Sequence, residues 1–220
     1  MIKSIVNSIL ALFMLMVSVS ANSAIVYQAD DRYIDHGIGG TFTPAAPYAD
    51  FNKEWWAYEA GAFQNTVIGS TGMSGSGSTY AGFDAAGYGA DANSVFSVSF
   101  EVDQLTDFSL TGSLDSNLYD SYVSVSLMEN GVSLFSMDSN DLIDFYSPGV
   151  MLTPFSYAGQ FDAGNRYQLI LSSYSFDSDY YSEEWKFDLA TTSVVPVPAA
   201  LWLFGSGFIL LAGVMKRKKV

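Results

Sequence analysis

The residues that could carry out nucleophilic or acid–base chemistry are few in this chain, and they form no known catalytic motif. The single histidine, His36, lies beside Asp35 in a glycine-rich segment, and no serine stands in the Gly-x-Ser-x-Gly pattern of a nucleophile elbow. The glutamates are scattered, and nothing in the sequence pairs them as a glycosidase pairs its carboxylates. We therefore expect no catalytic residues and a protein that is not an enzyme, with a secreted hydrolase as the weakest alternative.

The chain contains no cysteine, which excludes disulfides, thiol nucleophiles and thiolate metal sites. Oxygen donors remain, and oxygen is the ligand that calcium prefers in proteins. Asp138, Asn140, Asp141 and Asp144 lie close together in the sequence, but this segment lacks the glycine and the last glutamate of an EF-hand loop. We expect no cofactor unless calcium binds at these four residues, and a solvated acidic turn is the alternative.

Trp55 and Trp56 form, together with Tyr58, the densest aromatic cluster of the sequence. Adjacent residues of a β-strand point to opposite faces, so only one of the two indoles can enter the core of a sheet protein. We expect the other to be exposed, where its ring could stack on carbohydrate. The alternative is that both indoles are packed or covered by loops.

The middle of the chain has the pattern of a β protein. The dipeptide Asn130-Gly131 favours a type I′ hairpin turn, and no helix is predicted between Ile25 and Ser193. We therefore expect an all-β domain over residues 25–193, folded as an antiparallel β-sandwich or jelly roll. Apolar and polar residues alternate, as in half-buried strands, over residues 96–102, 108–114, 123–127 and 185–189, and residues 134–137 and 167–171 are predicted as two further strands.

Residues 69–94 are rich in glycine and serine and do not alternate. This composition predicts a flexible loop region between strands, with a mobile ligand-contacting loop as the alternative. Thr191-Thr192-Ser193 is predicted to be a short polar link that leaves a protease room to reach the segment that follows it.

The charge of this domain is strongly negative. All 23 acidic residues lie within residues 25–193, against four basic residues, which gives a formal net charge of −19. Such a surface repels phosphate backbones, so we expect no nucleic-acid partner. The four basic residues are Arg32, Lys53, Arg166 and Lys186.

The N-terminal residues 1–24 have the pattern of a secretory signal peptide. Lys3 precedes an apolar run over residues 9–17. Ala21, Ser23 and Ala24 supply the small residues that signal peptidase requires, so we expect cleavage within Ala21–Ala24. The alternative is an uncleaved N-terminal anchor, for which the apolar run is short.

The C-terminal residues 194–220 have the pattern of a membrane anchor. No charged residue occurs from Val194 to Met215, which as a helix would span about 33 Å, enough to cross a bilayer. We predict a transmembrane helix over about 196–215, and an ordinary single-pass anchor is the simplest interpretation. By the positive-inside rule, the basic cluster that follows would be cytoplasmic; it consists of Lys216, Arg217, Lys218 and Lys219.

This tail also resembles a known family. Pro196 and Pro198 with Ala199, followed by an apolar span and a basic cluster, resemble the PEP-CTERM protein-sorting domain of Gram-negative bacteria, in its variant reading Val-Pro-Leu-Pro-Ala. Val197 stands where that variant has leucine and where the better-known form has glutamate. The motif as it occurs here is Val195, Pro196, Val197, Pro198 and Ala199.

The resemblance implies a destination and several partners. Family members are exported surface or matrix proteins, often associated with exopolysaccharide, and a membrane-embedded exosortase is thought to cleave their tail. It implies here a secreted precursor held in the inner membrane with its body in the periplasm, and a mature form at the cell surface or in the matrix of a biofilm. The expected partners are the secretion machinery, an exosortase and exopolysaccharide. A surface carbohydrate-binding module, with or without structural calcium, is the alternative function.

Overall fold

The computed structural model describes residues 24–36, 40–57, 60–82, 90–116, 121–139, 151–176 and 181–193. These residues are almost entirely β-strand, and the part described contains no helix that is long and apolar enough to cross a membrane. The strands are β1 (Ile25–Asp30), β2 (Tyr33–His36), β3 (Gly40–Phe42), β4 (Phe51–Ala57), β5 (Ala60–Gly69), β6 (Gly72–Ala81), β7 (Asp91–Val102), β8 (Thr106–Ser116), β9 (Tyr122–Glu129), β10 (Val132–Asp138), β11 (Met151–Phe161), β12 (Tyr167–Phe176) and β13 (Tyr181–Ser193).

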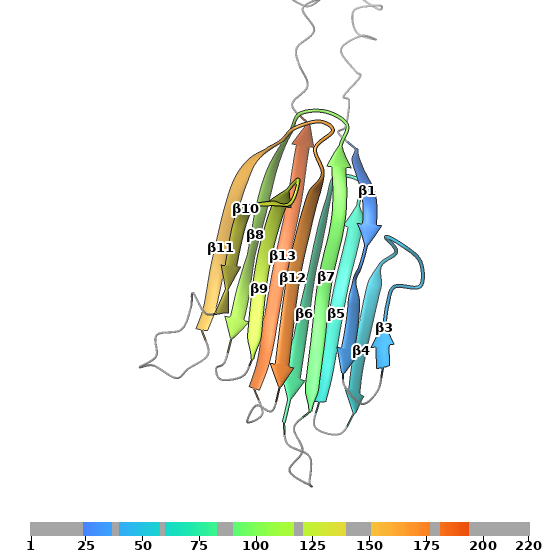
Figure 1. The fold of residues 1–220 in the computed structure, drawn as a ribbon, viewed down its shortest axis with the longest axis vertical. Helices are drawn as coiled ribbons and strands as arrows, with labels where there is room; N and C mark the ends of the chain where they lie inside the picture. Colours follow the sequence, from blue (N-terminus) through green and yellow to red (C-terminus); the bar gives the residue numbers. More distant parts are fainter. Residues whose placement is uncertain are drawn as a thin grey trace, which may run out of the picture. The chain divides into compact units, whose positions relative to one another are not determined.

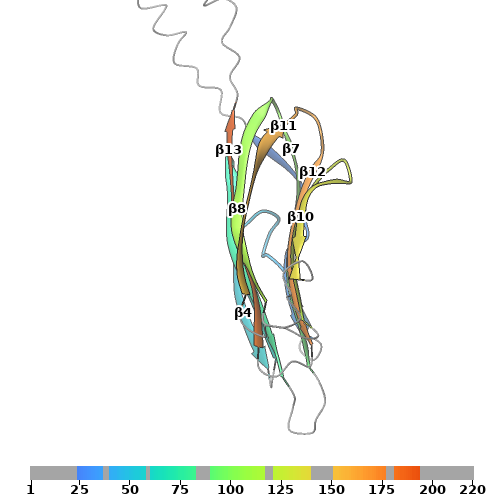
Figure 2. The ribbon, with the colours of Figure 1, turned by 90° about the vertical axis from the view of Figure 1, so that its left-hand side faces the viewer.

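The strands form two antiparallel sheets that pack face to face as a β-sandwich (Figure 2). The seven-stranded sheet has the order β10-β9-β12-β7-β2-β3, with β1 also paired to β7. The six-stranded sheet has the order β11-β8-β13-β6-β5-β4. Strands β6 to β13 run 6-13-8-11 in one sheet and 7-12-9-10 in the other, which is the double Greek-key order of a jelly roll (Figure 1). The expected fold class is confirmed for the body of the chain.

The predicted strands are all present. Each lies within one of β7, β8, β9, β10, β12 and β13, with its large apolar side chains turned into the core. The predicted hairpin joins β9 to β10, and both Asn130 (φ 49°) and Gly131 (φ 81°) have the positive φ that a type I′ turn requires.

The predicted loop over residues 69–94 is wrong for most of its length. Gly72–Ala81 is β6, a central strand paired to β5 and β13 along its whole length, and residues 91–94 begin β7. The glycines fit a strand because neighbouring side chains fill the space above them. A Cβ on Gly77 would lie 2.3 Å from the Trp185 indole, and one on Gly75 would lie 2.4 Å from the Thr66 methyl group.

We expect Gly77→Ala to lower the free energy of unfolding by about 1–3 kcal/mol, because the new methyl group overlaps the buried indole of Trp185. Gly69→Ala is the matched control, since the nearest atom to its Cβ would be 3.4 Å away, at ordinary contact distance. Urea denaturation followed by circular dichroism measures both variants. Equal stability of the two would show that the indole does not occupy the space above Gly77.

The predicted polar link over Thr191-Thr192-Ser193 is also wrong. These residues continue β13 and pair with β8 as far as Thr106. The Thr191 hydroxyl and backbone N–H both donate to the Thr71 carbonyl. The sandwich therefore extends to within two residues of Val195, where the sorting-type motif begins.

The core is a layer of apolar side chains between the sheets. Trp185 is fully buried, 6.3 Å from Phe96 between ring centroids, and its indole N–H donates to the Ser94 carbonyl. A smaller cluster around Ile34 and Phe51 packs between the two sheets, where β2 faces β5.

An ion pair with both side chains buried joins the two sheets beside this smaller cluster. The Arg32 guanidinium binds both oxygens of Asp30 at 2.7 Å, and it donates to the Thr66 hydroxyl of the opposite sheet at 3.0 Å and to the Ala49 carbonyl at 2.7 Å. Strands β1 and β2 pair along β7 on either side of Asp31–Arg32. Arg32 thus connects this edge of the seven-stranded sheet to β5 and to the segment between β3 and β4.

Candidate functional site

The outer face of the six-stranded sheet carries the exposed tryptophan that the sequence predicted. Trp56 is 56% exposed, whereas Trp55, on the opposite face of β4, is half-buried and packs against Phe42 with 4.9 Å between ring centroids. The prediction that the two indoles lie on opposite faces, with one on the surface, is confirmed.

Neighbouring strands support the exposed indole from below and from the side. Its cross-strand partner is Gly61, and a Cβ there would lie 2.1 Å from the ring, so the indole lies directly over the glycine. Tyr80, the partner of Gly61 on β6, places its ring centroid 5.9 Å from that of Trp56. The indole N–H donates to the Glu54 carboxylate. These contacts cover one face of the indole and fix its orientation. We call Trp56 and Tyr80 the aromatic platform.

We expect Trp55→Ala and Trp56→Ala to differ sharply in stability. Trp55 loses packing in the smaller core cluster, at a cost of about 2 kcal/mol or more, while Trp56 loses mainly exposed surface, at a cost below about 1 kcal/mol. Thermal unfolding of the two single variants measures the difference. The two-faced arrangement would be contradicted by equal shifts of melting temperature.

Two carboxylates face each other on the same outer face. Glu184 of β13 is the cross-strand partner of Asp115 on β8, and of Ser78 on β6. Burial raises the pKa of the Asp115 carboxyl, and the charge of Glu184 raises it further. The sequence could not predict this pair, because its members are far apart in the chain and only the register of β8 and β13 brings them together. The pair can accept hydrogen bonds from a hydroxyl-rich ligand.

We expect Asp115→Asn to raise the melting temperature at pH 7. The folded-state pKa of Asp115 lies above its unfolded value, so the ionised carboxylate destabilises the fold above that folded pKa, and the penalty disappears as pH falls below the unfolded value of about 3.9. The stabilisation should therefore vanish near pH 3. Asp188→Asn is the control, since Asp188 faces Ser74 and Thr111 instead of a carboxylate. A gain that persists at pH 3 would refute this explanation.

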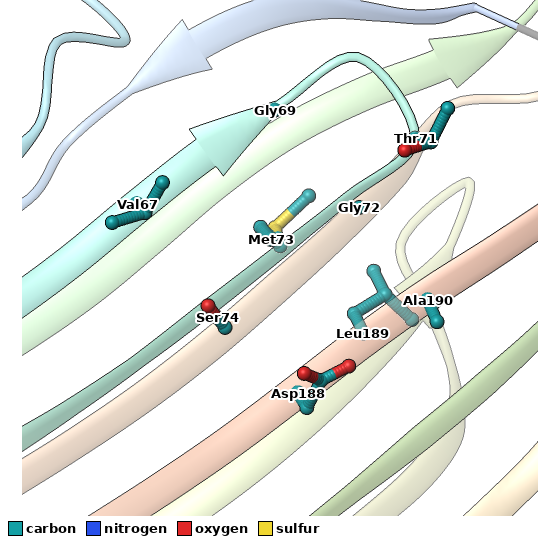
Figure 3. Close-up of a pocket in the computed structure, with 9 residues that line it drawn as sticks. All are labelled: Val67, Gly69, Thr71, Gly72, Met73, Ser74, Asp188, Leu189 and Ala190. Carbon is teal, nitrogen blue, oxygen red and sulfur yellow. The ribbon is translucent and has the colours of Figure 1, made fainter.

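The rest of this face carries small and polar side chains together with the exposed apolar residues Val67 and Leu152. Away from the platform it has an open hollow of about 240 Å³, too small for a typical ligand pocket (Figure 3). Asp188 is the only charged residue of its lining, and Gly72 and Ala190 leave space beside it. The complete lining consists of Val67, Gly69, Thr71, Gly72, Met73, Ser74, Asp188, Leu189 and Ala190.

No protein-family model matches the sequence, and no curated protein matches it. An exposed indole beside a tyrosine ring, with carboxylates on neighbouring strands, can bind a polyhydroxylated ligand through stacking and hydrogen bonds.

Most of the other predicted site residues lie outside the described residues, and those predictions are untested. Among them are the predicted transmembrane helix and the residues Ala21, Ser23, Val195, Pro196, Val197, Pro198, Ala199, Lys216, Arg217, Lys218 and Lys219. Ala24 is described, and it is exposed immediately before β1. His36 ends β2.

The calcium prediction also remains open. Asp138 is the last residue of β10, whereas Asn140, Asp141 and Asp144 lie outside the described residues. Within the part of the chain that the structure describes, no three acidic, histidine or cysteine residues group closely enough to hold a metal ion.

Proposed function

We propose that this chain is a non-catalytic, exported surface or extracellular-matrix protein of a Gram-negative bacterium. In this account, residues 1–24 direct export and are removed, and residues 194–220 hold the precursor in the inner membrane until an exosortase processes the tail. The mature sandwich then acts at the cell surface or in the matrix of a biofilm.

The observation that best supports this proposal is where the sandwich begins and ends. Strand β1 begins at Ile25, directly after the predicted signal cleavage region, and β13 ends at Ser193, two residues before the sorting-type motif. Removal of both terminal segments would leave each of the thirteen strands complete. The lack of cysteine and the charge of −19 fit a soluble body in an exported compartment.

Export can be tested by cysteine labelling, because the chain contains no cysteine of its own. The full chain is produced in a Gram-negative host with Ser133→Cys, an exposed position on β10, and treated with a maleimide that cannot cross the inner membrane. We expect labelling in intact cells or after the outer membrane is opened, and none when residues 1–24 are deleted. Labelling of Ser133→Cys only after complete lysis would refute export.

A second function, carbohydrate binding, is supported by the aromatic platform. Trp56 remains mostly exposed although Gly61 beneath it and Tyr80 beside it fix its position. Fixing an indole in advance lowers the entropy lost on binding. Because the body is strongly acidic, we propose a neutral polysaccharide, which it does not repel as it would an anionic one.

Affinity electrophoresis in gels that contain neutral polysaccharides tests this second function. We expect Trp56→Ala to lose about tenfold in affinity, which corresponds to about 1.4 kcal/mol and lies within the range of one aromatic stacking contact. Gly61→Ala keeps the indole but displaces it, and should weaken binding as well. Val67→Ala removes an exposed apolar side chain elsewhere on the same face and is the control. Carbohydrate binding at the platform would be refuted if Trp56→Ala and Val67→Ala migrated alike.

A further inference from the structure

Strand β11 is an exposed edge of the six-stranded sheet with unusual regularity. Among the strands that the structure describes it pairs only with β8, through eleven consecutive residue pairs from Met151 to Phe161 without a shift of register. Its outward-facing side chains include Leu152, which is 63% exposed, and the exposed Ser156 and Ala158. An edge of this length has a row of backbone N–H and C=O groups available to another strand.

The other sheet edges have features that oppose pairing. Strand β3 has only three residues, and β4 carries the charged Lys53 and Glu54. Strand β1 has an irregular register near Gln28, and β10 has one near Leu134. Short length, charge, bulges and proline are the devices by which edges avoid association, and of these β11 has only the single proline Pro154.

The absence of charge from β11 also indicates what kind of strand fits. Residues 151–161 contain no acidic or basic residue, although the body carries 23 acidic ones. On the adjacent β8, Asp107 and Asp115 face outward only near the two ends of the strand. The middle of the edge, around Ser156, is where two acidic bodies can approach with the least repulsion.

Pro154 indicates which backbone N–H groups of β11 face the open edge of the sheet. Pro154 lacks an N–H and pairs with Ser113 inside a regular ladder, which a strand tolerates where the missing donor would face solvent. Ser156 and Ala158 follow at two-residue steps, so their N–H groups also face the open edge. These donors are free to pair with a second strand.

We propose that two copies of this protein pair antiparallel through β11, with the two-fold axis near Ser156, to form one continuous twelve-stranded sheet. An antiparallel pair of identical strands is self-complementary, as a two-fold interface requires. The outer faces of the two six-stranded sheets then join, which places two aromatic platforms on one surface. This inference does not depend on the proposed export or on carbohydrate binding.

Single cysteine substitutions in the full chain, purified in mild detergent and oxidised with copper phenanthroline, test the pairing. Ser156→Cys should form disulfide-linked dimers, because residues opposed across an antiparallel pair have Cα atoms about 4.5–5.5 Å apart, within disulfide range. Ser109→Cys, exposed one strand further in, is the matched control, since three strand spacings and a four-residue offset would place its symmetry mate about 20 Å away. We expect at least about tenfold more dimer from Ser156→Cys.

A scan of the outward-facing positions locates the axis. Leu152→Cys, Ala158→Cys and Gln160→Cys should cross-link far less than Ser156→Cys, because their symmetry mates would lie four to eight residues away along the paired strands. Adding Ala158→Pro to Ser156→Cys should reduce the dimer several-fold, because proline removes one of the N–H donors of the open edge, whereas adding Ala158→Ser should not. Higher ionic strength should increase the dimer, because salt screens the acidic bodies from each other. The proposal is overturned if no β11 position exceeds the Ser109→Cys control, or if Ala158→Pro leaves the cross-link unchanged.

Discussion

Replacing Arg32 by methionine should lower the free energy of unfolding by about 3–5 kcal/mol, because it leaves the Asp30 carboxylate buried without its cation. The side chains of Arg32 and Asp30 are 0% and 2% exposed, so water cannot take over the lost hydrogen bonds. The same substitution removes the donors to Thr66 and Ala49. Denaturant unfolding of the body measures the loss.

The pH dependence identifies Asp30 as the cause. Burial alone would raise the pKa of Asp30, but hydrogen bonds from Arg32 and from the Tyr48 N–H outweigh it and hold the pKa below its usual value. In the unaltered protein, Asp30 therefore stabilises the fold above the unfolded pKa of about 3.9, and this stabilisation is lost as pH falls through the lower folded value. In Arg32→Met the folded pKa should instead be raised, so the difference between the two proteins should shrink as pH falls.

A double substitution completes this test. Asp30→Asn together with Arg32→Met removes both charges, so it should be more stable at pH 7 than Arg32→Met alone. If Asp30→Asn gave no recovery, the loss in Arg32→Met would come from packing and not from an uncompensated charge.

Replacing Trp185 by alanine should also cost about 3–5 kcal/mol, the range for a large aromatic side chain in a close-packed core. The indole is completely buried between the sheets, contacts Phe96 and Phe187, and lies over Gly77. Its loss leaves a cavity next to β6, where Gly77 has no side chain that could fill the space.

The glycine beneath the indole provides an internal control. Gly77→Ala is expected to destabilise the unaltered protein, but in the Trp185→Ala background the overlap with the indole is gone while that with the Ser94 hydroxyl remains, so the substitution should cost less there. Unfolding of the single variants and the double variant gives the coupling energy. Simple additivity of the two losses would contradict the packing of Trp185 over Gly77.

The parts of the fold that could be predicted from sequence are those whose side chains determine the strand by themselves. Strands β7 and β13 alternate large apolar residues with polar ones, so period two is visible locally. Strand β6 shows no such period, because the side chains that fill the space above Gly75 and Gly77 belong to Thr66 and Trp185 on other strands. Composition could not reveal this dependence on distant partners.

For the candidate site, too, the sequence predicted what depends on a single strand and missed what depends on strand pairing. The opposite orientations of Trp55 and Trp56 follow from strand geometry alone, and the sequence predicted them. Tyr80 joins Trp56, and Glu184 joins Asp115, only through the registers of β4 to β6 and of β8 with β13. A single sequence carries no signal for such long-range pairings.

The processing of the tail is the central claim of the proposed function, and the intact mass of the protein from its native host tests it most directly. The mass is measured in a strain that has the exosortase and in one that lacks it. We expect a product that ends within Val195–Ala199 only where the enzyme is present, and extra mass on that end would indicate attachment to a surface polymer. A product that still carries Lys216–Val220 in both strains would contradict the account and make the tail an ordinary membrane anchor.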